Sequence, residues 1–375
     1  MLIGIDASRA LRARRTGTEN YSLQLTRHLL RQDSGHDFRL YCQRQPSPGL
    51  FASDGSVLGV RVIPLPRLWT HVRLSAEMLT SPPDLLFVPS HVLPIVHPRR
   101  SVVTVHDLGY HWFPEAHTPA ARRQLDLSTR FNAATAAHVL ADSQATKDDL
   151  CRVYGTSADK VTVVHLGRDE TLQPVDDPER LRQVRAKLVI DRGEQARPYL
   201  LYVGTLQPRK NLLRLIDAFA AVVDLVPDLV LVLAGQRGWL ADPIFRRVEE
   251  LGLAGRVLFP GFVEDDDLAA LLSGALAFVF PSLYEGFGIP VLEAQACGTP
   301  ALASNTSSLP EVVGDGALLV DPLSTAAIAA GLRRLLTEPE LRDHLRAAGF
   351  ANVQRFSWER CARETLAVLE RVGNA

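Results

Sequence analysis

Short apolar segments alternate with longer amphipathic segments along the first 165 residues. The apolar segments have the length and bounding turn residues of buried strands, whereas the longer ones repeat their apolar positions at helical spacing. The predicted strands are Leu2–Asp6, Phe38–Cys42, Arg61–Leu65, Leu85–Pro89, Val102–His106, His138–Asp142 and Val161–His165. The predicted helices between them include Glu19–Arg31, Ala121–Ala136 and Ser143–Tyr154, and proline- and glycine-rich Gln45–Gly59 is predicted to be a surface loop. This alternation favours right-handed βαβ units and a parallel sheet covered on both faces.

The periodicity stops after His165 and then resumes. Leu166–Pro178 has loop chemistry and is predicted to be a hinge or linker. The second series has predicted strands at Tyr199–Val203, Leu229–Ala234, Arg256–Phe259, Leu276–Phe280, Ala301–Ser304 and Ala317–Val320. Its predicted helices are Asn211–Val223, Ile244–Leu251, Asp265–Leu272, Pro290–Cys297 and Thr325–Leu336, and two or more helices follow between Glu338 and Val372. The pattern predicts an α/β protein of two Rossmann-like doubly wound domains facing a cleft, with ligands outside the carboxyl ends of the strands.

Length and composition narrow the class of protein. A chain of 375 residues is long enough for two domains at roughly 150 residues each. The net charge of -1, without a basic or acidic tail, gives bulk nucleic-acid binding no electrostatic support. The four cysteines have no paired metal or redox spacing, which argues against a zinc site and fits a reducing compartment.

The apolar segments also bear on location. Met1-Leu-Ile-Gly-Ile-Asp6 lacks a basic region before a long apolar run, so it is predicted to be a first strand and not a signal peptide. The longest apolar segments, near Leu229–Gly235 and Leu268–Phe280, are shorter than the roughly 18 residues that span a bilayer. We therefore expect a cytoplasmic protein, with peripheral contact at the inner face of the membrane left open.

The segment from Ser282 to Gly298 carries the strongest functional pattern. A short apolar strand ends at Pro281, Pro290 suits the first turn of the next helix, and Gly298 suits its end. The glycines between strand and helix allow the chain to approach a ligand closely, and the helix start directs N–H groups toward an anion.

Two carboxylates belong to this segment. Glu285 precedes Gly286-Phe287-Gly288-Ile289, and Glu293 lies one turn into the helix. On their own, a solvated loop residue and a first-turn carboxylate favoured by the helix dipole would explain both.

The spacing, however, resembles the donor site of one large family. Two glutamates seven residues apart, with Gly-Phe-Gly after the first and a helix of small residues ending in Cys297-Gly-Thr-Pro300, are similar to retaining GT-B glycosyltransferases. That family includes sucrose synthase, bacterial glycogen synthase and mannosyltransferases of lipid and polysaccharide assembly. The resemblance implies Glu285 on the transferred sugar, Glu293 on the ribose hydroxyls, and the backbone from Gly286 to Ile289 near sugar and phosphate.

A second turn places two cations after the strand Tyr199–Val203. Gly204-Thr205-Leu-Gln-Pro-Arg209-Lys210-Asn211 resembles the turn with which the family binds the donor phosphates. Fixed cations stabilise the charge that grows on a diphosphate leaving group, so Arg209 and Lys210 are the candidates for this role. Thr205 stands where many members carry the phosphate-binding arginine, a contact that only Arg209 could replace. The alternative is a solvated turn before a helix.

The first half of the chain contributes a histidine. His106 follows a predicted strand, at the edge of the sheet where ligands bind, and resembles the family's active-site histidine near the transferred sugar. Asp107 would orient it or cap the next turn, and a packed or surface histidine is the alternative. His91, His97, His111 and His117 are treated as background.

Two weaker features lie in the same half. Gly17 resembles the family's glycine loop near the donor phosphates, but only one glycine is present. The preceding Arg9, Arg12, Arg14 and Arg15 would belong to that loop or face solvent or the acceptor. Trp112 and Phe113 would contact an acceptor or lipid headgroups, or simply pack under a loop.

The resemblance implies a retaining hexosyltransferase that uses a GDP- or UDP-linked sugar, with mannose favoured, and a glycan or lipid-linked acceptor. It implies no cofactor and no metal, and no Asp-x-Asp pair stands at a strand end, since Asp265-Asp-Asp267 is predicted to cap a helix. Residues 1–170 would bind the acceptor, residues 171–355 the nucleotide sugar, and the helix of residues 356–375 would cross back to the first domain. A sugar-nucleotide epimerase of the same fold and a non-catalytic binding module are the alternatives. A nicotinamide dehydrogenase is disfavoured because no Gly-x-Gly-x-x-Gly follows the first strand.

Overall fold

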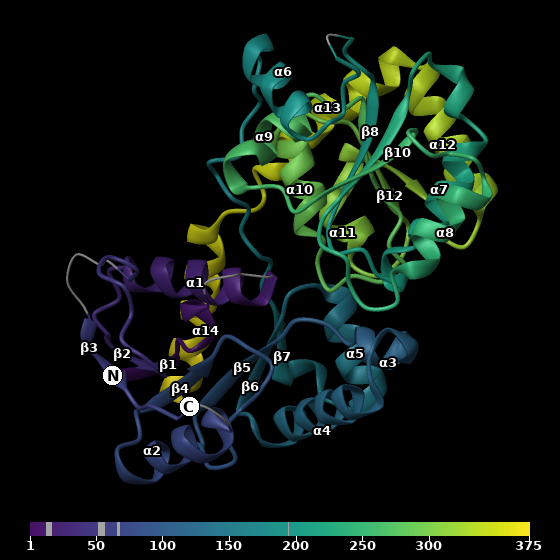
Figure 1. The fold of residues 1–375 in the computed structure, drawn as a ribbon. Coiled ribbons are helices and arrows are strands. Elements are labelled where there is room, and N and C mark those ends of the chain that lie inside the picture. The colour runs from purple at the N-terminus through teal and green to yellow at the C-terminus, as the bar shows by residue number, and fades with distance from the viewer. Residues whose placement is uncertain (13–16, 52–56, 66–67, 194) are drawn as a thin grey trace. The chain divides into compact units, whose positions relative to one another are not determined.

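The computed structural model describes residues 1–12, 17–51, 57–65, 68–193 and 195–375 (Figure 1). They form two compact units. The first contains Met1–Gly167 and Phe356–Ala375, and the second contains Arg168–Arg355. The first of the two divisions falls within the segment Leu166–Pro178, which has no regular apolar period, and the second falls between Arg355 and Phe356.

The first unit is built on a seven-stranded sheet in which all strands are parallel. The order across the sheet is β3-β2-β1-β4-β5-β6-β7. The strands are β1 (Leu2–Asp6), β2 (Asp37–Cys42), β3 (Val57–Val62), β4 (Leu85–Val88), β5 (Ser101–Val105), β6 (His138–Ala141) and β7 (Val161–Val163). The central strands β4, β5 and β6 are buried along their whole length, as expected for a parallel sheet covered on both faces.

Helices and single helical turns connect the strands of this sheet. The α-helices are α1 (Gly17–Leu30), α2 (Ser75–Thr80), α3 (Gly109–Trp112), α4 (Pro119–Thr135), α5 (Gln144–Tyr154) and α14 (Trp358–Asn374), and the π-helical η2 (Trp69–Leu74) runs into α2. The single-turn elements are η1 (Arg9–Leu11), η3 (Pro114–Ala116) and η4 (Ala158–Lys160). The C-terminal helix α14 packs against α1, β4 and β5, so the last residues of the chain complete the core of the first unit.

The second unit repeats this plan with a six-stranded parallel sheet. Its order is β10-β9-β8-β11-β12-β13. The strands are β8 (Tyr199–Val203), β9 (Val230–Ala234), β10 (Val257–Gly261), β11 (Ala277–Phe280), β12 (Ala301–Ser304) and β13 (Ala317–Val320). The α-helices are α6 (Pro178–Lys187), α7 (Leu212–Ala220), α8 (Asp242–Glu250), α9 (Asp265–Ser273), α10 (Ile289–Ala296), α11 (Leu309–Val313), α12 (Thr325–Thr337) and α13 (Pro339–Val353). The single-turn elements are η5 (Pro208–Lys210), η6 (Val223–Leu225) and η7 (Gly314–Gly316).

Figure 1 shows α7, α8 and α12 on one side of this sheet and α9, α10 and α13 on the other. The prediction of two doubly wound parallel sheets is therefore confirmed.

The strand order locates the ligand position of each sheet. In the first unit, β2 and β3 extend the sheet on one side of β1, and β4 to β7 extend it on the other side. In the second unit, β9 and β10 lie on one side of β8, and β11 to β13 lie on the other. The order of the strands therefore reverses between β1 and β4 and between β8 and β11. Loops after the two strands of such a pair part to opposite faces and leave room at the carboxyl ends. The second pair leads directly into η5 with Arg209 and Lys210, and into the loop with Glu285.

Some predicted elements were wrong in place or missing. The third strand is Val57–Val62 and not Arg61–Leu65, so the end of the predicted loop Gln45–Gly59 belongs to a strand. Pro64 cannot donate a ladder hydrogen bond, which explains why the strand stops before it. Helices α2, α3 and α6 had no counterpart among the predicted elements because their apolar stripes are too short for a clear period.

Candidate functional site

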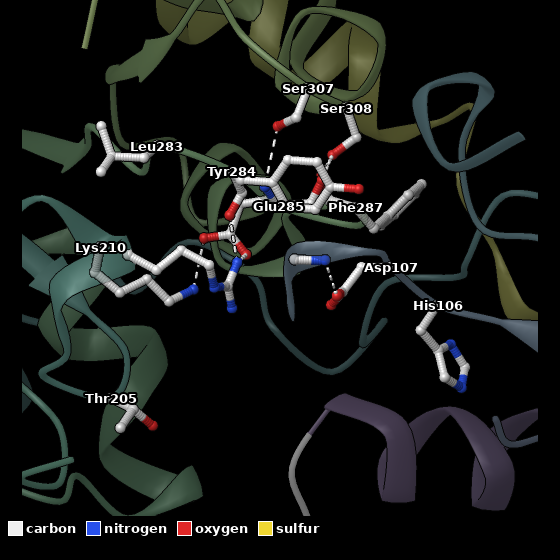
Figure 2. Close-up of polar contacts among 12 residues, drawn as sticks. His106, Asp107, Thr205, Lys210, Leu283, Tyr284, Glu285, Phe287, Ser307 and Ser308 are labelled. Carbon is white, nitrogen blue, oxygen red and sulfur yellow. Dashed lines mark hydrogen bonds and ion pairs between the residues drawn. The ribbon is translucent and has the colours of Figure 1, made fainter. Parts of the chain in front are cut away.

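Glu285 lies buried between two cations in the second unit. Lys210 Nζ donates to Glu285 Oε1 at 2.6 Å, and Arg209 donates to Glu285 Oε2 at 3.1 Å (Figure 2). Arg209 also donates to the carbonyl oxygen of Tyr284. Only 8% of Glu285 and 9% of Lys210 are exposed, so the cluster is shielded from water. The sequence therefore brings three of the predicted site residues into direct contact.

Electrostatics keep this glutamate ionised. Burial alone would raise the pKa of Glu285, but Arg209 and Lys210 outweigh it and lower the pKa to about 2. Lys210 also lies over the ring of Phe280, with its Nζ 5.0 Å from the ring centroid. One carboxylate faces two cations, and the cluster thus retains one excess positive charge at neutral pH.

Asn211 ties the two loops of the cluster together. It adopts a left-handed conformation, with φ of 60°, at the junction of η5 and α7, where asparagine is better tolerated than most residues. Its side-chain amide donates to the carbonyl oxygens of Pro281 at 3.0 Å and Pro322 at 2.7 Å. The backbone N–H of Leu283 donates to the carbonyl of Arg209 at 2.9 Å. Asn211 is therefore a buried residue whose hydrogen bonds join the ends of neighbouring strands.

Two serines that the sequence analysis did not single out hold the Glu285 loop from its other side. The backbone N–H of Glu285 donates to Ser307 Oγ at 3.0 Å, and Ser308 Oγ lies 2.9 Å from the carbonyl of Glu285 and 2.7 Å from that of Phe287 (Figure 2). Both serines follow β12, the strand next to β11 in the sheet. The sequence signal that could have identified these serines was their position after a short buried strand.

The remaining predicted donor residues of this unit line the same loops. Gly288 has φ of 117°, and a Cβ there would lie 2.7 Å from Leu309, so both conformation and space require glycine. Gly204 has φ of 152° at the end of β8, and Thr205 after it is exposed. Gly286 and Phe287 are buried, and Ile289 begins α10 with Pro290 in its first turn.

Glu293 presents a carboxylate of a different kind. It is half-buried in α10, and no hydrogen bond or ion pair joins its side chain to any residue in the described ranges. Burial, with Asp169 and Asp265 nearby, raises the pKa of Glu293 to about 7. A carboxyl group that has no cation beside it, and whose pKa is near neutral pH, is suited to accept hydrogen bonds from hydroxyl groups of a ligand.

His106 pairs with a carboxylate in the first unit. It follows β5, and its Nδ1 lies 2.7 Å from Oδ2 of Asp142, which follows β6. Burial disfavours the imidazolium, but Asp142 prevails and raises the pKa of His106. Tyr21 packs its ring edge-on against the imidazole, with centroids 4.8 Å apart. Asp142 was missed as a site residue, although two successive predicted strands both ended on a polar residue.

Neighbouring candidates have structural partners. Asp107 Oδ1 accepts from the backbone N–H of Gly109 at 2.8 Å, so it caps the turn, while Asp142 orients the histidine (Figure 2). Trp112 donates to Asp149 at 3.0 Å and lies under the guanidinium of Arg152 at 4.3 Å. These contacts anchor its indole within the first unit.

The glycine-loop candidate is described only in part. Gly17 is the first residue of α1, and a Cβ added to it would meet nothing within 4 Å. Arg9 forms an ion pair with Glu19 at 3.5 Å. Arg14 and Arg15 lie outside the described residues. The backbone thus gives no steric reason for glycine at this position.

The described residues contain no group of three or more His, Cys, Asp or Glu side chains that could hold a metal ion. Asp265–Asp267 begin α9 as predicted, but the helix start has no side-chain cap, and Asp267 instead binds Arg180 at 2.8 Å. None of the helices in the described ranges combines the length and apolar character needed to cross a bilayer.

Family models match both halves of the chain. The model described as "Glycosyltransferase Family 4" covers residues 15–172, and the model described as "Glycosyl transferases group 1" covers residues 186–351. These matches place a family domain on each of the two sheets.

Individual relatives agree with the family models. The chain is 34% identical over 269 residues to the O-antigen chain mannosyltransferase B of Escherichia coli, covering 72% of this chain and 69% of that one. It is 32% identical over 228 residues to the serotype-specific mannosyltransferase WbdA of Escherichia coli, covering 60% of this chain but only 27% of that longer protein.

Among solved structures, Anabaena HepE in complex with UDP and glucose aligns over 98% of this chain and 99% of its own, with a TM-score of 0.75 and 19% identity. Two parallel doubly wound sheets and this alignment define a GT-B fold. The chain belongs to the glycosyl transferases group 1, a family of GT-B glycosyltransferases.

Proposed function

We propose that the protein transfers a hexose from a nucleotide-diphosphate sugar to a glycan or lipid-linked acceptor, with retention of anomeric configuration. Mannose from GDP-mannose is the favoured donor, supported by the mannosyltransferases among the relatives. The observation that carries the proposal is the buried cluster of Glu285, Lys210 and Arg209 at the reversal point of the second sheet.

Lys210 and Arg209 are the proposed ligands of the donor diphosphate. Their cluster has one excess positive charge and little access to water, and charge-assisted hydrogen bonds gain strength in such surroundings. As the bond between sugar and diphosphate breaks, the leaving group gains negative charge. Fixed cations then stabilise the transition state more than the bound substrate.

The two glutamates would divide the recognition of the donor. Glu285 is ionised and held by its neighbours, which suits a fixed acceptor for sugar hydroxyls. Glu293 has no cation beside it within the described residues, which suits an acceptor for the two ribose hydroxyls. The backbone from Gly286 to Ile289 would lie along sugar and phosphate, with Gly288 and the start of α10 allowing close approach.

In the first unit, His106 is the proposed residue near the transferred sugar, and Asp142 fixes its ring. Asp142 accepts from Nδ1, and Nε2 is buried without a hydrogen-bond partner among the described residues, so the ring is held in one orientation. The departing phosphate itself would help to take the proton of the acceptor hydroxyl in a substitution on the front face of the sugar.

Donor turnover by point variants tests the proposal. Lys210→Ala should lower the release of GDP from GDP-mannose, with mannoside or lipid-diphosphate acceptors, by about a hundredfold or more, the usual loss when one fixed donor to a transition-state charge is removed. Lys187→Ala is the matched control, because Lys187 binds Asp267 on the surface of the same unit. Wild-type turnover by Lys210→Ala would refute the assignment, and an isomerised sugar nucleotide formed without acceptor would indicate an epimerase instead.

A further inference from the structure

A second histidine lies at the carboxyl edge of the first sheet. His91 follows β4, the strand that pairs with β1 and with β5, whereas His106 follows β5. Burial and the charge of His106 together lower the pKa of His91 to about 4, so the two imidazoles lie near each other. Because the strand order reverses between β1 and β4, His91 stands at the edge where this sheet would bind a ligand.

Helix α4 holds the backbone at His91. The carbonyl oxygen of His91 accepts from Ser128 Oγ at 3.0 Å and from Asn132 Nδ2 at 2.6 Å. Asn132 Oδ1 also accepts from the backbone N–H of Leu93 at 3.2 Å. Asn132 is itself buried, so this helix fixes the loop after β4 by hydrogen bonds on both sides of His91.

The ring of His91 is held through one of its two nitrogens. Nε2 lies 2.5 Å from Oγ1 of Thr129, a buried residue of α4. That hydroxyl group donates its single proton to the carbonyl oxygen of Leu125 at 2.9 Å and accepts from the hydroxyl of Tyr110 at 2.6 Å. Because a carbonyl oxygen can only accept, Nε2 must be the donor in its contact with Thr129. Neutral His91 therefore carries its proton on Nε2 and a lone pair on Nδ1.

The Nδ1 atom of His91 is available to a ligand. It makes no hydrogen bond to any group in the described ranges, and the side chain is only half-buried. The lowered pKa keeps the ring neutral at pH 7. A neutral nitrogen with a lone pair accepts a hydrogen bond from a hydroxyl group, but it has no proton to donate to a phosphate. Nδ1 therefore suits an uncharged ligand that carries hydroxyl groups.

We propose that His91 accepts, through Nδ1, a hydrogen bond from a sugar hydroxyl group of the acceptor. The inference rests on the proposed function, which assigns the donor diphosphate to the second unit and so leaves an uncharged site in the first unit for the other substrate. The two histidines differ in this respect. Nδ1 of His106 is taken by Asp142, and its Nε2 is buried without a partner among the described residues, whereas Nδ1 of His91 stays open to a ligand.

Two substitutions separate the roles of the two ring nitrogens. The amide of glutamine takes the place of Nε2 and keeps the contact with Thr129, whereas the amide oxygen of asparagine takes the place of Nδ1. In transfer from GDP-mannose to methyl α-mannoside, His91→Gln should raise the KM for the mannoside by about tenfold, the loss of one hydrogen bond to the substrate. His91→Asn should raise it much less, and both variants should keep the wild-type KM for GDP-mannose.

His97→Gln is the matched control. His97 also joins the segment after β4 to α4, because its Nε2 lies 3.1 Å from Thr135 Oγ1, but its Nδ1 is already engaged, at 3.1 Å from Ser101 Oγ. This substitution should leave both KM values unchanged. The melting temperature of each variant checks that it folds.

An equal or larger rise in the mannoside KM for His91→Asn than for His91→Gln would overturn the proposal, because the contact with Thr129 would then be what matters. A rise in the KM for GDP-mannose alone would assign Nδ1 to the donor instead. Nitrogen NMR shifts give an independent readout, since a proton on Nδ1 of His91 would contradict the expected tautomer. Wild-type kinetics in His91→Gln would refute the role of His91 alone, whereas wild-type protein that releases no GDP would refute the proposed function and this role with it.

Discussion

The chemistry of the second unit depends on how the buried charges of Glu285 and Lys210 and the half-buried charge of Arg209 compensate one another. Glu285 neutralises one of two cations, and its ionised state depends on both Arg209 and Lys210. Removing a member of such a cluster leaves a buried charge uncompensated, which costs more than the intact pair contributes. Single substitutions within the cluster should therefore cost stability as well as diphosphate binding.

Glu285→Gln should lower the free energy of unfolding by roughly 3 kcal/mol, because it leaves two cations facing each other in a buried site. Lys210→Met should cost less, since Glu285 keeps its contact with Arg209 at 3.1 Å. Urea unfolding of both variants measures the difference. An equal or larger loss for Lys210→Met would show that the cluster is not held together by the glutamate.

The raised pKa of Glu293 predicts a pH dependence of stability. The folded carboxyl group holds its proton up to about pH 7, whereas its ordinary pKa is 4.5. Between these values the native state binds more protons than the unfolded state, so stability falls as the pH rises through this window. The full effect is on the order of 3 kcal/mol at 1.36 kcal/mol for each pH unit.

Comparing urea unfolding near pH 5 and pH 8 isolates this contribution. The wild type should lose more stability than Glu293→Gln over that interval, because glutamine does not titrate. Identical losses in the two proteins would contradict the assignment of this pH dependence to Glu293.

At the scale of elements, the contact between Gly167 and α14 holds the end of the chain on the first unit. A Cβ at Gly167 would lie 2.5 Å from Cγ of Trp358 and would also overlap the backbone N of that residue. Trp358 is buried at the first turn of α14, so neither partner can move aside cheaply. Gly167→Ala should therefore lower the melting temperature by several degrees, corresponding to an overpacking cost of about 1–3 kcal/mol.

Gly17→Ala is the control for this substitution. A Cβ at Gly17 meets nothing within 4 Å, so its melting temperature should stay close to that of the wild type. A decrease in donor affinity without a decrease in stability would support a close approach of Gly17 to a ligand. Equal melting temperatures for Gly167→Ala and the wild type would show that α14 is free to shift.

Much of this architecture was predictable because buried parallel strands are short, apolar and bounded by turn residues. β1, β8, β12 and β13 have the predicted bounds, and Pro281 and Pro290 stand where the strand ends and the helix begins. The contact of Glu285 with Lys210 was not predictable from spacing, because it joins loops 75 residues apart. The same holds for Asp142, whose distance from His106 depends on the register of Val105 with Ala141 in adjacent strands. The expected roles of the site residues came from the resemblance to a family. Their contact partners, in contrast, depend on how the strands pair in the folded sheets.

The whole molecule consists of one continuous unit and one discontinuous unit. Residues 168–355 contain a complete core with the entire second sheet, whereas the first unit needs both residues 1–167 and the last helix. A fragment of residues 168–355 should therefore fold alone and unfold cooperatively, while a fragment of residues 1–167 should be markedly less stable without α14. Circular dichroism melts of both fragments test this, and a stable, cooperative fragment 1–167 would contradict it.

The central claim is that Lys210, Arg209 and Glu285 form the diphosphate site of a nucleotide-sugar enzyme. Isothermal titration calorimetry of GDP into the full chain, with UDP and ADP in parallel, tests it without knowledge of the acceptor. We expect GDP to bind the wild type and Lys187→Ala equally, and Lys210→Ala to bind about tenfold to a hundredfold more weakly, the loss of one charge-assisted contact. Failure of the wild type to bind any of the three nucleotides, or wild-type affinity in Lys210→Ala, would contradict it.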